Sequence, residues 1–322
     1  MPRLRLPRRL VVPGVVFLLT RAGESLVTLW GVVTIVFFSL RLTGDPALLL
    51  LPVGATPQQI AALRHALGFD RPLPVQYVDF LERAVRGDFG VSTRFGEPAL
   101  PLVLARLGAT AELAVLAMVV AVVIGGLAGA AAAMRPNTRV ELAAMGTALI
   151  GQATPVFWLA IMLILVFAAT LRWLPSGGIG GWTHLVLPVL TLATYSTASI
   201  ARLLRASLLE ARAEDYARTA RAKGLGDRTV LRRHLLKNAL IPVVTVLGLQ
   251  VGLLLGGAVI TETVFSWPGE GRLIVQAIQN QDFPIVQAGT CVLAVIIIGV
   301  NLLVDLTYMV LDPRIRVPGA AG

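Results

Sequence analysis

Residues able to carry bond chemistry are few in this chain and lie far apart. The histidines His65, His184 and His234 are widely separated, and none stands in the H-E-x-x-H spacing that places two zinc ligands on one helix face. The single cysteine, Cys291, has no second thiol with which to form a disulfide or a thiolate metal cluster within the chain. The sequence therefore predicts no catalytic metal site, and no cofactor is expected.

Hydrolysis of a nucleotide or of a peptide bond also lacks the residues it needs. No G-x-x-x-x-G-K-[ST] string, whose backbone amides cradle phosphates, occurs in the sequence. The string from Gly224 to Asp227 matches the G-x-G-D of membrane aspartyl proteases, but that chemistry needs two carboxylates sharing one site. Asp227 lies in a basic segment, and no earlier apolar run offers an Asp partner. We expect a protein that is not an enzyme, with any ATPase on a separate polypeptide.

Two carboxylates lie within apolar runs, where ionisable groups are the usual mark of ion-coupled transport. They are Glu112 and Asp305, and both stand toward the ends of their runs. Asn301 precedes Asp305 by one helical turn, so this pair has a second interpretation as a polar contact that holds helices together. An ion-coupled secondary transporter or channel is therefore kept as an alternative.

The elements that must position these residues are membrane helices. Of the 322 residues, 56% are hydrophobic and only 14% are charged, against roughly 25% charged in a soluble domain. Six apolar runs reach the roughly 20 residues that cross a bilayer as a helix, which predicts an all-α polytopic fold. The expected segments are a basic N-terminus at 1–22, spans at 23–42, 104–133, 143–170, 185–205, 239–261 and 286–311, an outer helical insertion at 43–103, an inner loop at 206–238, an outer hairpin at 262–285 and a tail at 312–322.

The placement of the positive charges predicts the orientation. If both termini are cytoplasmic, 19 of the 28 Lys and Arg residues lie on the inner side, as the positive-inside rule requires. The net charge of +10 thus belongs to membrane topology and contact with lipid, and nucleic acid is not an expected partner. The start of the chain resembles a signal peptide, but Pro13 and Gly14 interrupt its apolar stretch, so we expect a basic lead-in at the membrane surface.

The outer insertion carries its own helix signals. Thr56 and Gln59 have the spacing of a capping box, with Pro57 in the first helical position and Gly68 as a stop. A second helix is expected from Pro74 to Arg86. The residues expected to share its apolar face are Tyr77, Leu81 and Val85. Two roles stay open for these helices, which either cap the bundle or receive a delivery protein and line a vestibule.

The inner loop predicts a helix, a glycine turn at Gly224 and a second helix from about Asp227. Ala217, Ala220 and Gly224 recur at i, i+3 and i+7, so one face of the first helix is small enough for another surface to approach closely. A partner protein could dock there. The alternative is a solvated basic helix that serves topology alone.

The outer hairpin at 262–285 is rich in glycine, proline and aromatic residues, which favours an irregular or re-entrant turn. Irregular backbone at membrane depth survives only where it is buried in protein or lines a cavity. Phe265, Trp267 and Gly269 are therefore candidates to line a pathway. An interfacial aromatic anchor is the equally open alternative.

Several ordered strings resemble the dipeptide, oligopeptide and nickel permease family of bacterial ABC importers. They are RLTGDPA at 41–47, ATPQQIAALRHALGFDRPLPVQY at 55–77, RGDFGVS at 86–92, PVFWLA at 155–160, DYARTARAKGL at 215–225 and AVITETVFSWPGEGRL at 258–273. The string at 215–225 is similar to the EAA-type loop of these permeases. The resemblance covers about residues 20 to 316, and it departs from the general motif where Asp215 and Tyr216 replace Glu before the Ala.

The resemblance implies a type I importer permease in the bacterial inner membrane. Its implied partners are a second homologous permease, two cytoplasmic ATPase subunits and an extracytoplasmic solute-binding protein. The residues that would couple to the ATPase are Asp215, Tyr216, Ala217, Thr219, Ala220, Lys223 and Gly224. A peptide is the expected solute, and a dipeptide, a longer peptide, a nickel chelate and glutathione all stay open.

Overall fold

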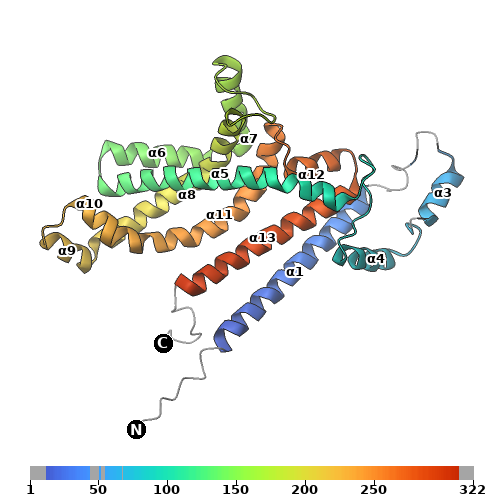
Figure 1. Cartoon of the computed structure of the whole chain (residues 1–322), viewed down its shortest axis with the longest axis horizontal. Coiled ribbons are helices and arrows are strands. Elements are labelled where there is room, and N and C mark those ends of the chain that lie inside the picture. Colours follow the sequence, from blue (N-terminus) through green and yellow to red (C-terminus); the bar gives the residue numbers. More distant parts are fainter. Residues whose placement is uncertain (1–11, 44–50, 52–54, 67, 312–322) are drawn as a thin grey trace, which may run out of the picture. The chain divides into compact units, whose positions relative to one another are not determined.

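The computed structural model describes residues 12–43, 51, 55–66 and 68–311, and these are almost entirely helical (Figure 1). Within them, the only β-type pairing is an isolated bridge between Val91 and Pro98. The chain divides into two compact units, one from the ranges Met1–Arg86 and Thr290–Gly322 and the other from Gly87–Gly289. The expected all-α fold is confirmed.

Five described helices are long and apolar enough to cross a membrane, and a sixth span results if a bent helix pair counts as one. The five single candidates are Thr20–Leu42, Ala99–Met134, Thr183–Ala213, Val246–Val264 and Phe283–Val304. The bent pair is Arg139–Ala153 with Val156–Thr170, whose axes differ by 108°.

The bent pair corrects the expectation of one continuous helix at 143–170. Helix α6 (Arg139–Ala153) ends before Thr154, which is extended at φ −81° and ψ 125°, and α7 (Val156–Leu163) begins after Pro155. A residue that precedes proline is disfavoured in the helical region because the proline ring clashes with its backbone. Helix α7 then continues into a π-helical turn, η1 (Ile164–Thr170).

The first unit joins α1 (Val12–Thr43), α3 (Pro57–Ala66) and α4 (Leu73–Val85) with the later part of α13 (Phe283–Leu311). The predicted capping box of α3 is confirmed, because Thr56 N donates to Gln59 Oε1 at 2.9 Å and Gln59 N donates to Thr56 Oγ1 at 3.4 Å. Gly68 follows with φ +69°, a left-handed conformation that suits glycine at a helix end.

The buried face of α4 differs from the expected one. Phe80 is buried and stacks on Phe37 of α1 at 5.4 Å, and Tyr77 OH lies 2.6 Å from Thr34 Oγ1. Val85, expected on this face, is exposed. The face therefore runs through Tyr77 and Phe80, because the aromatic side chains of α1 supply the surface against which α4 packs.

The second unit is built around the long helices α5 (Ala99–Met134), α8 (Thr183–Ala213) and α11 (Leu236–Val264), and α8 contacts α5, α6 and α11 (Figure 1). Gly125 and Gly129 let α5 approach α8 closely. A Cβ on Gly129 would lie 2.5 Å from the carbonyl oxygen of Ala201, and one on Gly125 would lie 2.7 Å from that of Thr197. This is the small-x-x-x-small packing of membrane helices.

Two further departures concern the segments between spans. The hairpin expected to be irregular contains a ten-residue helix, α12 (Glu270–Gln279), flanked by Ser266 and Gln281 at positive φ. Helix α8 continues beyond residue 205 as far as Ala213, where the short helices α9 (Asp215–Ala222) and α10 (Asp227–Val230) and the π-helical turn η2 (Leu231–Leu235) follow.

Candidate functional site

The segment from α9 to α10 projects from the end of α8 as a separate helix and turn. Glu214 is extended at φ −69° and ψ 151°, so it breaks the helical path and starts α9 in a new direction. Gly224 ends that helix at φ +79°, and its N–H donates to the carbonyl of Arg221 at 2.9 Å. Only glycine adopts this conformation without strain, which is why the helix stops where the sequence predicted.

The predicted coupling residues divide between the interior and the surface. Ala217 and Ala220 are 0% and 4% exposed, and they lie in one apolar cluster with Leu208 of α8 and Val230 of α10. The small face of α9 therefore packs on the chain itself, which corrects the expectation that a partner approaches along it. The predicted residues that remain accessible are Asp215, Tyr216, Thr219, Lys223 and Gly224.

The accessible face of α9 combines an aromatic side chain with charged neighbours. Tyr216 is 37% exposed. Arg218 pairs with Asp215 at 3.4 Å, and Arg221 lies 3.9 Å from Asp227 of α10, so both pairs stay within the segment. Exposed ion pairs of this kind contribute little to stability. The surface that they frame is available for contact with another protein.

Polar contacts fasten the base of α9 to the spans. Arg212, near the end of α8, donates to the carbonyl of Ala133 at the end of α5. Arg205 Nε donates to Glu141 Oε1 of α6 at 2.6 Å, and Glu141 also accepts from Asn137 N at 2.5 Å. These contacts tie the later part of α8, from which α9 projects, to α5 and α6.

The three residues proposed from the hairpin are held in packed positions. Phe265 is buried beside Ala160 and Leu187, and its carbonyl accepts from Gly178 N at 2.8 Å. Trp267 is buried as well, with its Nε1 donating to the carbonyl of Ala109 at 2.9 Å. Such buried contacts tie the hairpin to its own unit, so a role in lining a pathway stays a prediction.

Gly269 has no room for a side chain because the Glu262 carboxyl occupies that space. A Cβ on Gly269 would lie 2.2 Å from Glu262 Cδ. Glu262 accepts hydrogen bonds from Thr110 Oγ1 at 2.7 Å and from Arg272 N at 3.0 Å. The second bond provides a partner for one of the backbone N–H groups in the first turn of α12, which have none within the helix. This carboxylate was missed in the sequence, where two glutamates eight residues apart around Pro268 and Gly269 were the available signal.

Glu270 is the second buried carboxyl at this end of the unit. Its side chain is 0% exposed, and neither carboxyl oxygen has a hydrogen-bond partner among the described residues. Burial raises the pKa of Glu270 to about 8, and the neighbouring Glu262 carboxylate adds to the effect. Glu270 therefore holds a proton across much of the physiological pH range.

The ion-coupling role proposed for two carboxylates stays a prediction. Glu112 has an exposed side chain on α5. Asp305 lies in α13, and its side chain is outside the described part of the structure.

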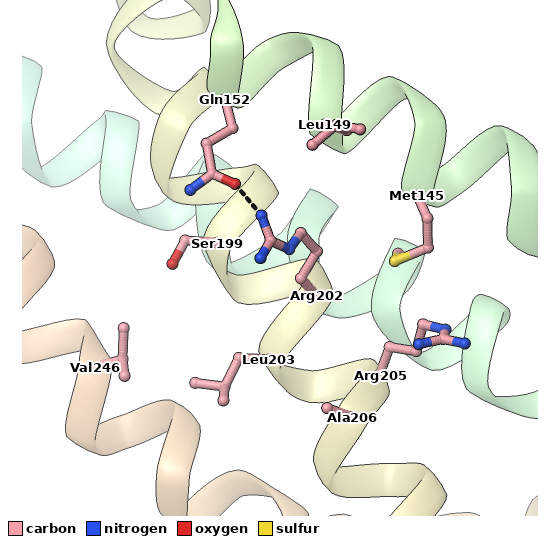
Figure 2. Close-up of a pocket in the computed structure, with 9 residues that line it drawn as sticks. All are labelled: Met145, Leu149, Gln152, Ser199, Arg202, Leu203, Arg205, Ala206 and Val246. Atoms are coloured by element: carbon pink, nitrogen blue, oxygen red, sulfur yellow. Dashed lines mark hydrogen bonds between the residues drawn. The ribbon is translucent and has the colours of Figure 1, made fainter.

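A cavity of about 630 Å³ lies between α6, α8 and α11 (Figure 2). Its polar lining comes from Gln152, Ser199, Arg202 and Arg205, with Leu203 among the apolar residues. Arg202 donates to the side-chain oxygen of Gln152, the contact drawn as a dashed line in Figure 2. In the sequence Arg202 is only one of the basic residues on the inner side, and nothing in the spacing indicates that it faces a cavity.

Comparisons with known proteins agree with this architecture. Residues 121–317 match the family model of the binding-protein-dependent transport system inner membrane component, and residues 15–114 match the model of its N-terminal part. A dipeptide transport system permease protein of Alkalihalophilus pseudofirmus is 43% identical, over 88% of this chain and 94% of its own length. A glutathione transport system permease protein of Escherichia coli is 42% identical, over 90% of this chain and 95% of its own.

Solved structures show the same fold at low sequence identity. An amino acid ABC transporter crystallised with histidines aligns with a TM-score of 0.52 at 20% identity, over 66% of this chain and 94% of that one. A methionine ABC transporter in an inward-facing conformation aligns with a TM-score of 0.53 at 18% identity, over 66% and 96%. The fold is that of a type I importer permease.

These matches decide the class of the protein. It is a multi-pass inner-membrane permease subunit that works with ATPase and substrate-binding partners, and the ATPase is a separate subunit. The chain belongs to the family of binding-protein-dependent transport system inner membrane components.

Proposed function

We propose that this chain pairs with a second, homologous permease to form the translocation pathway of a peptide importer. Two cytoplasmic ATPase subunits would drive the pair, and an extracytoplasmic solute-binding protein would deliver the solute. A peptide is favoured because relatives over 40% identical are named for dipeptide and peptide transport. Glutathione, itself a peptide, and nickel chelates remain alternative solutes within the same class.

The observation that carries the proposal is the accessible helix α9, fastened at its base to the spans. The face with Tyr216, Thr219 and Lys223 is the right size for a groove on an ATPase subunit, since short helices dock by a few anchoring side chains. The neighbouring face, with Ala217 and Ala220, holds α9 on its own chain. A docked ATPase would thus grip a helix that cannot move independently of the bundle.

Movement of the ATPases would reach the pathway through the contacts at the base of α9. Arg212 ties α8 to α5, and the pair of Arg205 with Glu141 ties α8 to α6. Closing of the two ATPases on ATP would therefore rock the spans as a body between inward-facing and outward-facing states. In this scheme the spans carry out no bond chemistry.

The proposed orientation places both termini and α9 in the cytoplasm. The exposed basic residues in and after α9 support it, because the positive-inside rule places a segment rich in Lys and Arg in the cytoplasm. The helices α3 and α4 would then lie outside, where they cap the bundle or receive the solute-binding protein. The hairpin with Phe265, Trp267 and Gly269 would close the outer end of the unit.

The proposal is tested by isolating the chain with its neighbouring gene products and reconstituting the complex in vesicles. Native mass spectrometry should find two permeases and two ATPase subunits. Uptake of labelled dialanine should require both ATP and the binding protein. A complex without ATPase subunits, or uptake that a proton gradient alone sustains, would overturn the proposal and favour ion coupling.

A further inference from the structure

The cavity between α6, α8 and α11 contains one positive charge without a counter-ion. Arg205 is matched by the Glu141 carboxylate. Arg202 contacts only the neutral amide of Gln152 among the described residues, and no acidic side chain lines the cavity. The Arg202 side chain is exposed in the single chain. A guanidinium exposed on a candidate span needs water, lipid or a ligand to compensate its charge.

Polar side chains beside the cavity pair α8 with α11. Gln250 of α11 donates from Nε2 to Ser199 Oγ at 2.9 Å and accepts from Ser196 Oγ at 3.0 Å. Both serines belong to α8, and Ser199 lines the cavity directly. Hydroxyl and amide groups beside a guanidinium are suited to bind a carboxylate, because they can donate to its oxygens in addition to the charged pair.

The Arg202 side chain extends toward the break in the bent helix pair. Gln152 stands two residues before Thr154, where α6 has ended. A Cβ on the adjacent Gly151 would lie 2.8 Å from Thr194 Cγ2, so the break is level with Thr194 on α8. Thr194 precedes Arg202 by eight residues, or about 12 Å of helix. Arg202 thus reaches into the span and away from α9.

Broken helices at membrane depth are tolerated where they are buried in protein or line a cavity, and transporters build substrate sites beside them. We propose that this cavity is a station on the translocation pathway, where Arg202 binds a carboxylate of the solute and Gln152 and Ser199 complete the contact. The proposal rests on the importer function and adds to it a solute class, small molecules with a free carboxylate. The phosphate of a lipid headgroup is the other anion that could pair with Arg202, and the test distinguishes it from a carboxylate.

The test measures binding without the solute-binding protein, whose own selectivity would otherwise dominate. The complete permease and ATPase complex is purified in detergent without nucleotide, and binding of labelled dialanine is measured by equilibrium dialysis. Unlabelled dialanine and dialanine amide, which lacks the carboxylate, compete for the site. The variants are Arg202→Met, which keeps the apolar stem, Arg202→Lys, which keeps the charge, and Arg135→Gln as a matched control on an arginine that is also exposed but does not line the cavity.

We expect Arg202→Met to weaken dialanine binding by about tenfold or more, as loss of a charged hydrogen bond predicts. Arg202→Lys should retain part of the affinity, Arg135→Gln should retain all of it, and the amide should compete poorly with the wild type. Equal binding by wild type and Arg202→Met would overturn the inference. The inference would also be overturned if Arg202→Met lost bound labelled phosphatidylglycerol but bound dialanine as the wild type does. That result would make the cavity a lipid site.

The outcome is separable from that of the proposed function. ATP-dependent uptake by the wild-type complex tests the importer on its own. If that uptake is present and Arg202→Met imports dialanine with the wild-type KM and maximal rate, only the carboxylate station fails.

Discussion

Replacing Tyr216 by alanine separates the docking role of α9 from its packing role. The Tyr216 side chain is 37% exposed, whereas the adjacent Ala217 is fully buried. A buried aromatic anchor in an interface commonly contributes about 2 kcal/mol or more, which corresponds to about 30-fold in affinity. We therefore expect Tyr216→Ala to weaken binding of the ATPase subunit about 30-fold and to cost the permease about 1–2 kcal/mol of stability from the buried part of the side chain.

The matched variant Ala217→Leu should have the opposite effect. Ala217 is enclosed by the apolar cluster that includes Leu208 and Val230, so a larger side chain has no space and should cost about 1–3 kcal/mol of stability. Binding of labelled ATPase subunit to purified permease, measured beside thermal unfolding in the same detergent, compares the two variants. If Ala217→Leu weakened ATPase binding with unchanged unfolding while Tyr216→Ala bound normally, the small face would be the docking face and our assignment would be wrong.

Three further predictions concern the bundle. Gly129→Val should push α5 from α8, because its Cβ would lie 2.5 Å from the Ala201 carbonyl oxygen, and thermal unfolding should show a loss of about 1–3 kcal/mol. Glu270→Gln should raise the melting temperature at pH 9 but not at pH 4. Because the pKa of Glu270 is raised, its protonated form stabilises the fold fully below about pH 4.5, and this stabilisation is lost as the pH rises through about 8. Arg205→Met and Glu141→Gln should each reduce the amount of solute transported per ATP hydrolysed. The double variant should be no worse than either single variant, because both substitutions remove the same contact.

The sequence predicted the existence of the long helices well, because an apolar run of 20 residues has few other stable conformations in a bilayer. It did not predict the break at Pro155. A proline within an apolar run permits either a kinked helix or a full interruption, and the choice depends on neighbouring helices. Here α7 packs against α8 and α11 in its new direction, and those contacts lie outside any local pattern.

In the candidate site, too, the sequence predicted one feature and missed another. The spacing of Ala217 and Ala220 correctly predicted that one face of α9 is closely packed, but spacing cannot say which surface covers a face. The chain's own α8 and α10 do so. Arg202 was visible only as one of many basic residues, because the features that distinguish it, the cavity and the absence of a carboxylate partner, arise when α6 and α8 come together.

The central claim is that ATP hydrolysis on separate subunits drives solute through this chain and its partner permease. The most direct test follows labelled dialanine into vesicles that hold the complete complex, with the loaded binding protein outside and ATP or a non-hydrolysable analogue inside. We predict accumulation above the external concentration with ATP and none with the analogue. Accumulation with the analogue under an imposed ion gradient would contradict the account.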